Sequence, residues 1–295
     1  MKKTLQKSVI GLMTLIGAGI APVVWGQEAT MGPNSTVWRL NLDKSIHQTP
    51  APKSDRRISQ VTGDNFLLSI RGVGEDGNSF ALVYNGKIDG KDYPVKGTPN
   101  VDMFSLTRSG PKSVAAVLKK NGKAVAEADS ATSADNRSWI FAIRLIDDKG
   151  RKSPISVEVY DRIDPAEGMW VLNLAKSNYQ TPAPKAETRH FRVVDDLFDV
   201  VAIGANAAGL PYRQTWKLRL DGQDYPVQGE PTIDTLASTS SGSGAVSTVG
   251  KKNGQVVIRA ERTISADGMT MRLVSNLTLP DGSTARNVAV YELQQ

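Results

Sequence analysis

Apolar and polar side chains alternate with a period of two along most of the chain. Trp38, Leu40 and Leu42, for example, alternate with Arg39 and Asn41. The same pattern runs through residues 80–85 and 139–145. A period of two places apolar side chains on one face of an extended strand, and no segment has the 3.6-residue stripe of a helix. The pattern therefore predicts an all-β protein whose strands each bury one face.

Turn signals separate the predicted strands. Asn-Gly and Asp-Gly pairs supply the positive φ angles that tight hairpin turns require. They occur at 76–77, 89–90, 121–122, 221–222, 253–254, 267–268 and 281–282. Repeated hairpins favour antiparallel meanders of about nine or ten short strands, and closure into a barrel removes the exposed edges of such a meander. A two-sheet sandwich is the alternative, although sandwiches usually need crossover connections.

The chain carries the same domain twice. The block from Trp38 to Lys53 returns from Trp170 to Lys185, and residues 89–97 return at 221–229. A repeat this long is a whole domain rather than a solenoid unit. Because the junction between the copies is short, we expect the two barrels to pack on each other. The predicted parts are a signal peptide at 1–26, an N-terminal linker at 27–35, a lipocalin-like barrel 1 at 36–163 and a lipocalin-like barrel 2 at 164–295.

The N-terminal segment has the organisation of a Sec signal peptide. Lys2, Lys3 and Lys7 precede an apolar run over residues 9–24, and Gly26 is the last residue before the expected cleavage site. An uncleaved anchor is the alternative, but the run is shorter than the roughly 20 apolar residues that span a bilayer. No later segment is long and apolar enough to span. We therefore expect a periplasmic or secreted protein with no integral membrane span after cleavage.

Composition narrows the partners and the chemistry. The chain has no cysteine, which excludes disulfides, thiolate metal sites and a cysteine nucleophile. The formal net charge is +6, and three lysines of the signal segment supply half of it. The other basic residues form no stripe interleaved with aromatic residues, so we expect no nucleic-acid partner.

One connection differs from the hairpins. Residues 45–54, between the first two predicted strands, contain the sequence Thr-Pro-Ala-Pro, and copy two repeats it. Alternating prolines hold the backbone extended and remove hydrogen-bond donors. The segment is either a lid across a barrel mouth or a stiff surface connector.

Gly168 and Trp170, at the start of a predicted strand, resemble the Gly-x-Trp opening of lipocalin-like barrels. In that family the Trp closes one end of the barrel, and an Arg near the last strand often packs across it. The resemblance implies barrel closure by Trp38 with Arg162 in copy one and by Trp170 in copy two. Copy one departs from the pattern with Thr36 in place of the Gly, and copy two lacks the Arg.

A closer resemblance is to exported bacterial proteins with tandem lipocalin-like, calycin-type β-barrel domains. Their domains share Trp-x-Leu-Asn, Pro-Ala-Pro-Lys and Asp-Gly-x-Asp-Tyr-Pro-Val blocks and end in Val-Tyr followed by an acidic residue. Both copies carry these blocks, so the resemblance covers residues 36–295. It specifies the type of domain and implies no activity.

Few residues offer catalytic chemistry. His47 and His190 occupy unmatched positions in the two copies and lack metal-binding spacing. We therefore expect each to be a solvated or hydrogen-bonded side chain rather than a metal ligand or a catalytic base. Glu127 and Asp129 share a strand face opposite alanines, so we expect them to point into solvent rather than to act as acid and base. No nucleophile elbow or phosphate loop occurs. We expect no metal and no cofactor, and the catalytic residues, if any, are unknown.

The interior-facing positions differ between the copies. If a ligand cavity exists, we expect apolar and aromatic side chains of these positions to line it. Copy two is more polar there, because a Gln replaces a Leu. The predicted lining residues are Phe80, Leu82, Tyr84, Trp139, Phe141, Tyr212, Gln214, Trp216 and Met271.

Three functions fit this description. The leading hypothesis is extracytoplasmic binding of an apolar or amphipathic small molecule, which rests largely on fold analogy. The first alternative is a cofactor-free isomerase or cyclase for a hydrophobic substrate, which a buried ionisable group of perturbed pKa in a cavity would indicate. The second is a non-catalytic envelope or secreted interaction module, which an exposed apolar patch would indicate. Binding is favoured over catalysis.

Overall fold

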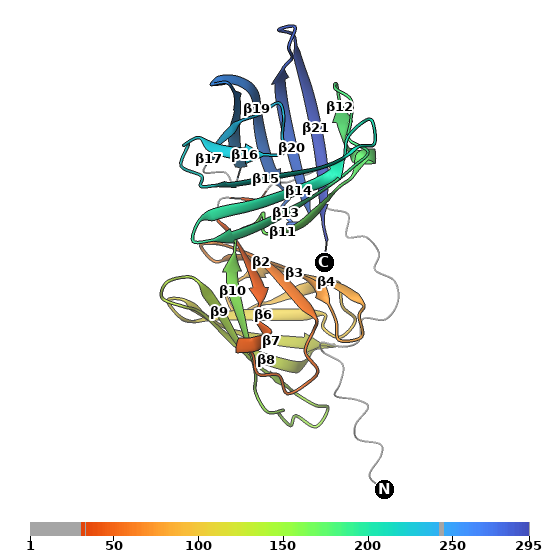
Figure 1. Ribbon diagram of the computed structural model, residues 1–295. Helices are drawn as coiled ribbons and strands as arrows, with labels where there is room; N and C mark the ends of the chain where they lie inside the picture. The colour runs from red at the N-terminus through yellow and green to blue at the C-terminus, as the bar shows by residue number, and fades with distance from the viewer. Residues whose placement is uncertain (1–30, 33, 242–244, 295) are drawn as a thin grey trace. The chain divides into compact units, whose positions relative to one another are not determined.

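Each copy of the repeat forms an antiparallel β-barrel of its own (Figure 1). The computed structural model describes residues 31–32, 34–241 and 245–294. The predicted signal peptide and residues 27–30 of the predicted linker lie outside the described residues. Within the described part of the chain, no α-helix occurs and no helix could cross a membrane. The prediction of an all-β chain with two barrels is confirmed.

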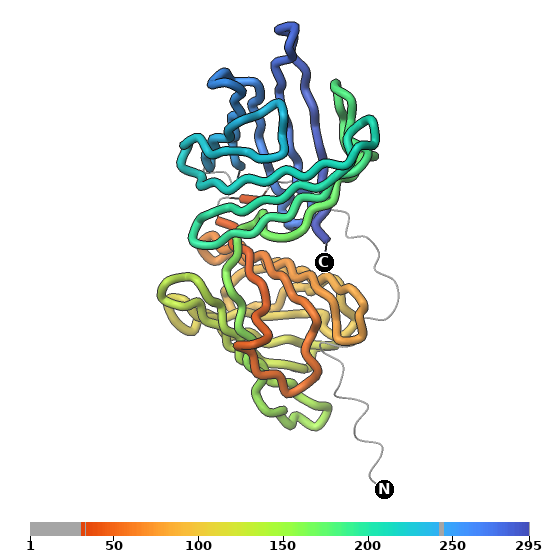
Figure 2. Tube along the Cα trace, viewed as in Figure 1, coloured from red at the N-terminus to blue at the C-terminus, as the bar shows by residue number. Residues whose placement is uncertain are grey.

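Barrel 1 is a closed meander of ten strands. β1 pairs with both β2 and β10, which closes the sheet and rules out the sandwich. The tube in Figure 2 passes from hairpin to hairpin in the order of the sequence. The elements are β1 (Ser35–Leu40), η1 (Leu42–Lys44), β2 (Ser54–Thr62), β3 (Asn65–Val73), β4 (Ser79–Lys87), β5 (Asp92–Lys96), β6 (Met103–Gly110), β7 (Ser113–Lys120), β8 (Lys123–Thr132), β9 (Ser138–Leu145) and β10 (Ser156–Ile163).

Barrel 2 repeats this meander and adds one very short strand. β11 pairs with both β13 and β21, and this closes the sheet. The two-residue β12 lies beside β21. The elements are β11 (Gly168–Leu172), η2 (Leu174–Lys176), β12 (Asn178–Tyr179), β13 (Ala186–Val194), β14 (Leu197–Ala205), β15 (Pro211–Leu218), β16 (Tyr225–Gln228), β17 (Thr235–Ser241), β18 (Ala245–Lys252), β19 (Gln255–Ile264), β20 (Thr270–Thr278) and β21 (Thr284–Leu293).

The Asn-Gly pairs form the tight turns that the sequence predicts. Asn121 has φ 49° and Gly122 has φ 77°, and Asn253 and Gly254 repeat these values at 50° and 77°. Both residues of a type I′ turn need positive φ, which Asn and Gly tolerate best. These two turns join β7 to β8 and β18 to β19.

The repeated Trp-x-Leu-Asn-x-x-Lys-Ser block fastens the end of the first strand of barrel 1 to the last strand. Asn41 donates to Asp161 Oδ2 at 2.6 Å, and Lys44 Nζ lies 3.0 Å from Asp161 Oδ1. The Ser45 hydroxyl accepts from the backbone N–H of Val159 at 2.9 Å. In barrel 2, the matching residues make the same contacts with Glu292 and Val290. The block is therefore a device for closing the barrel.

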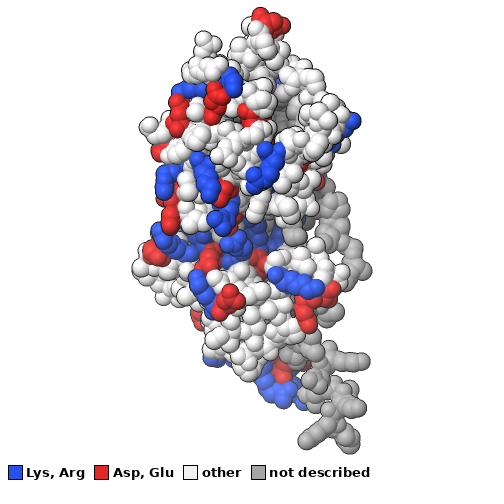
Figure 3. All heavy atoms as spheres, in the orientation of Figure 1, with Lys and Arg blue, Asp and Glu red and all other residues white. Residues whose placement is uncertain are grey.

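Charges of both signs lie side by side on the face in view in Figure 3. Ion pairs also join segments of each barrel that lie apart in the sequence. Near one hairpin tip, Lys119 Nζ lies 2.7 Å from Asp92 Oδ1. At the matching place in barrel 2, Lys251 Nζ lies 2.7 Å from Asp224 Oδ2. Exposed pairs of this kind are worth about 0–1 kcal/mol each, so they hold local geometry more than the fold.

Candidate functional site

Barrel 1 encloses a cavity of about 540 Å³. Its walls come from the inner faces of the strands, where the period-two pattern places apolar side chains. The predicted residues Phe80, Leu82, Tyr84, Trp139 and Phe141 all line it. Other apolar residues of the wall are Phe66, Leu68, Ile70, Phe104, Leu106, Val114, Ala116, Leu118 and Ala128.

Aromatic rings form part of the wall. The ring centroids of Trp139 lie 5.6 Å from Trp38 and 4.5 Å from Phe141. Tyr84 and Phe104 meet edge to face at 5.2 Å. These separations suit aromatic pairing and leave apolar ring surface toward the cavity.

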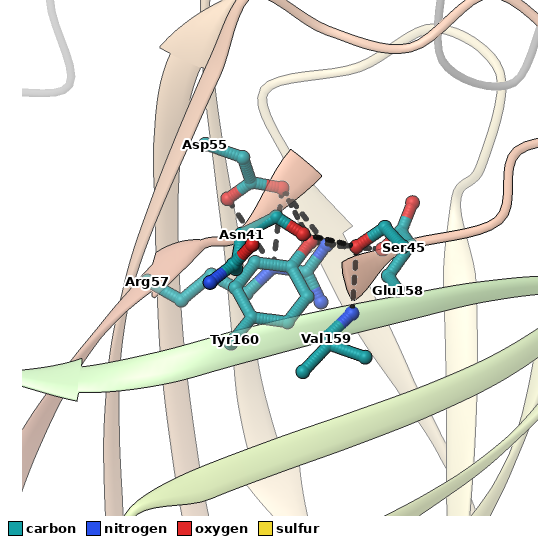
Figure 4. Close-up of polar contacts among 7 residues, drawn as sticks. All are labelled: Asn41, Ser45, Asp55, Arg57, Glu158, Val159 and Tyr160. Carbon is teal, nitrogen blue, oxygen red and sulfur yellow. Dashed lines mark hydrogen bonds and ion pairs between the residues drawn. The ribbon is translucent and has the colours of Figure 1, made fainter. Parts of the chain in front are cut away.

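A buried polar cluster borders this apolar cavity. We call it cluster 1: Asp55 and Arg57 on β2, with Glu158 and Tyr160 on β10 (Figure 4). All four are at most 5% exposed. Asp55, Arg57 and Glu158 line the cavity together with its apolar wall, and Arg108, Lys112 and Arg162 are further charged residues of the lining.

Arg57 and Tyr160 join the two carboxylates of cluster 1. Arg57 Nη2 lies 2.9 Å from Asp55 Oδ2 and 3.0 Å from Glu158 Oε2. The Tyr160 hydroxyl lies 2.9 Å from Asp55 Oδ2 and 2.8 Å from Glu158 Oε2. The guanidinium also packs 4.0 Å from the centroid of the Tyr160 ring. Arg57 therefore donates to both acids, and the single Tyr160 proton is within reach of either one.

The electrostatics keep both donors protonated. Burial acts to lower the pKa of Arg57, but the charges of Asp55 and Glu158 outweigh it and raise that pKa. Burial raises the pKa of Tyr160 well above its ordinary value, and the two nearby acids add to the effect. Burial also raises the pKa of Tyr84, in the cavity wall, to about 12. At neutral pH the guanidinium stays charged and the phenol stays a hydrogen-bond donor.

The Thr-Pro-Ala-Pro segment borders the cavity. Gln48, Thr49 and Pro52 line it. Ile46 forms a β-bridge to Val157, and the backbone N–H of Gln48 donates to Ser156 Oγ at 3.0 Å. These contacts hold the segment beside β10 at the border of the cavity, which is compatible with both a lid and a stiff surface connector.

Barrel 2 has a related cluster, which we call cluster 2: Glu187, Arg189, Tyr212 and Tyr291. Arg189 Nε and the hydroxyls of Tyr212 and Tyr291 all donate to the Glu187 carboxylate. Burial and the Glu187 charge raise the pKa of both tyrosines. One acid and one guanidinium balance each other, and the tyrosines complete the contacts of the carboxylate.

The cavity of barrel 2 is smaller, about 270 Å³. Phe191 and Arg262 replace Ser59 and Ser130 at the matching interior positions. The Arg262 guanidinium lies 5.4 Å from the Phe191 ring centroid and 5.7 Å from that of Phe198, and burial lowers its pKa. Larger side chains thus fill space that is open in barrel 1.

The predicted lining residues of barrel 2 are only partly in place. Tyr212 borders the small cavity. Gln214 does not, and instead donates to Glu230 Oε2. Trp216 and Met271 also lie outside the lining, and Met271 is 1% exposed. The structure therefore does not bring these three predicted residues together around the small cavity.

The residues predicted to close the barrels lie in different surroundings. Trp38 is buried in the wall of the cavity and donates to Ser59 Oγ at 2.9 Å. Arg162 is its Cα partner on β10 and borders the same cavity, but is exposed. Trp170 is completely buried and donates to the Ala166 carbonyl at 2.7 Å.

Sequence reasoning missed both clusters. An acid-x-Arg pair follows Pro-Ala-Pro-Lys by one residue in each copy, as Asp55–Arg57 and Glu187–Arg189. This duplicated signal was available in the repeat. The two acids that the sequence pattern singled out, Glu127 and Asp129, belong to neither cluster. Glu127 Oε1 lies 2.6 Å from Lys152 Nζ at the surface.

Cluster 2 predicts a specific acid sensitivity. Burial acts to raise the pKa of Glu187, but Arg189 and the hydrogen bonds outweigh it and hold that pKa below 4.5. A lowered folded pKa contributes stability above the unfolded pKa, and this is lost as pH falls through the folded value. Thermal unfolding from pH 7 to pH 3 should therefore show the gap between wild type and Glu187→Gln narrowing below about pH 4.5. A gap that stays constant would contradict this assignment.

Comparisons with known proteins identify no family for this chain. No protein-family profile and no curated protein matches the chain. One similar solved structure is a DUF3598 family protein of unknown function from Nostoc punctiforme, with 9% identity and a TM-score of 0.30, over 89% of this chain and 97% of that one. Another is a double mutant of transferrin binding protein B from Haemophilus parasuis, with 9% identity and a TM-score of 0.22, over 91% of this chain and 77% of that one.

Proposed function

We propose that barrel 1 binds an apolar or amphipathic small molecule in its cavity. The observation that carries this proposal is the aromatic and aliphatic chamber of about 540 Å³. Small-molecule sites typically measure about 300–1,000 Å³ and combine apolar walls with a few placed polar groups. Barrel 1 falls in this range and barrel 2, at about 270 Å³, falls below it.

We also propose that binding takes place outside the cytoplasm. The N-terminal segment, with its lysines and apolar run, supports export to the periplasm or beyond. The chain has no cysteine, so its folding there depends on no disulfide. We also propose that both barrels are lipocalin-like. The Gly-x-Trp opening and the sequence blocks shared with exported tandem-barrel proteins support this.

Native mass spectrometry of the exported protein tests the proposal. The expected result is a co-purified small molecule at one copy per chain, released on unfolding and extractable into organic solvent. If the protein is consistently free of ligand and also takes up no apolar probe, the proposal is wrong.

A second candidate is a cofactor-free isomerase or cyclase. The observation that favours it is the Glu158 carboxylate beside the protonated Tyr160 at the edge of an apolar chamber, since such pairs can move protons. Incubation of the extracted molecule with the protein would then yield a product of equal mass and different retention, and Glu158→Gln would abolish the conversion. An unchanged molecule would exclude this candidate and leave binding in place.

A further inference from the structure

Glu158 carries a buried carboxylate oxygen that has no hydrogen-bond partner among the described residues. Its Oε2 atom accepts from Arg57 and Tyr160, but its Oε1 atom is buried and accepts no hydrogen bond. The residue is 2% exposed and lines the cavity. Leaving a buried acceptor unsatisfied is unfavourable, and more so for a charged group. Within the described part of barrel 1, no group donates a hydrogen bond to this oxygen.

Cluster 1 also has one acid more than it has cations. Asp55 and Glu158 share Arg57, and among the described residues Arg57 is the one cation within ion-pair distance of either carboxylate. Both oxygens of Asp55 accept from Arg57, so neither lacks a donor. The excess negative charge and the carboxylate oxygen without a hydrogen-bond partner are thus both found at Glu158.

Barrel 2 provides an internal comparison. It has Ala289 at the position of Glu158, and its single acid, Glu187, accepts from Arg189 and two tyrosines. The acid–Arg–Tyr arrangement is thus complete with one carboxylate. A scaffold role does not account for the second carboxylate of barrel 1, which occurs where the cavity is large.

The chemistry of this position favours a cationic head group. An ammonium group could donate to Glu158 Oε1 and balance the excess charge, and the low dielectric of an apolar chamber strengthens both effects. Phe141, the Cα partner of Glu158 on β9, also lines the cavity, and an aromatic ring can stabilise a cation further. A carboxylate head at this position would lie beside the carboxylates of Asp55 and Glu158 instead, although Arg108, Lys112 and Arg162 line other parts of the cavity.

We propose, on the basis of the binding function above, that barrel 1 selects amphipathic amines. The protonated amine of the ligand donates to Glu158, and its apolar part occupies the aromatic chamber.

Competition binding with ligands of one tail and three heads tests this proposal. Decylamine, decanol and decanoate would displace the neutral probe N-phenyl-1-naphthylamine from the purified full-length mature protein at pH 7. Decylamine should bind more tightly than decanoate by about tenfold or more, which is the scale of one charge-assisted hydrogen bond. Glu158→Gln should weaken decylamine by about tenfold and change decanol by less than about threefold.

Glu127→Gln is the matched control, because it makes the same chemical change at an acid that pairs with Lys152 at the surface. It should leave all three affinities unchanged. If Glu158→Gln does not fold, Glu158→Ala, which copies barrel 2, replaces it. Any of three results would overturn the amine proposal: equal affinities for the three heads, a preference for decanoate, or an unaltered decylamine affinity in the Glu158 variant. Decanol binding would still uphold the cavity as a binding site. Failure of every ligand and of the probe to bind would overturn the binding function itself.

Discussion

Replacement of Arg57 by Met is expected to destabilise barrel 1 by about 3–5 kcal/mol, the usual consequence of removing one partner of a buried ion pair. Arg57 is the cation that Asp55 and Glu158 share, and all three are at most 5% exposed. Without the guanidinium, two neighbouring carboxylates face each other in an apolar chamber.

Urea unfolding of wild type and Arg57→Met measures this loss. Arg151→Met is the control, because Arg151 makes its ion pair with Asp147 at 2.7 Å while 62% exposed. Surface pairs of this kind contribute about 0–1 kcal/mol. Equal effects of the two substitutions would show that cluster 1 does not depend on the buried guanidinium in the way described here.

Ala116→Phe is expected to weaken probe binding by more than about tenfold, because the new ring would occupy the space of the ligand. Ala116 lines the cavity and lies opposite Leu106 and Ala128, which are both buried. The cavity gives the phenyl ring room, so we expect a smaller loss of stability than the 1–3 kcal/mol typical of overpacking a filled core. The measurement is the dissociation constant of N-phenyl-1-naphthylamine.

The neighbouring Ala115→Phe is the matched control. Successive side chains of a strand point to opposite faces, and Ala115 lies opposite the exposed Asp129. This variant adds the same ring to the outer face of β7 and should bind the probe like wild type. If both variants bind equally well, the probe site is not the cavity.

The fold was largely predictable because its determinants are local. Alternation at Trp38–Leu42 and the turn at Asn121-Gly122 act over a few residues, and the barrel follows from joining such hairpins and removing their edges. The pairing of β1 with β10 could be expected only from the need to close the meander. Its side-chain basis, the contacts of Asn41 and Ser45 with β10, appears only in the structure.

The apolar residues of the cavity wall could be predicted from the alternation of apolar and polar positions. The charged residues that border the cavity could not, because they break this alternation. Phe80 and Trp139 line the cavity as the alternation indicates. On β2 the pattern misleads, because Asp55 and Arg57 border the cavity while Ile58, on the other face, is also buried. Whether an interior is open depends on the sum of many side-chain volumes, so the filling of barrel 2 could not be inferred from Met271 alone.

Titration of the wild-type mature protein with N-phenyl-1-naphthylamine tests the central claim most directly. Trp38 and Trp139 border the cavity, so probe emission and tryptophan emission report on the same event. We predict one saturable site per chain, with a rise in probe emission and parallel quenching of tryptophan. Absence of saturable binding would contradict the claim that barrel 1 is a small-molecule binding chamber.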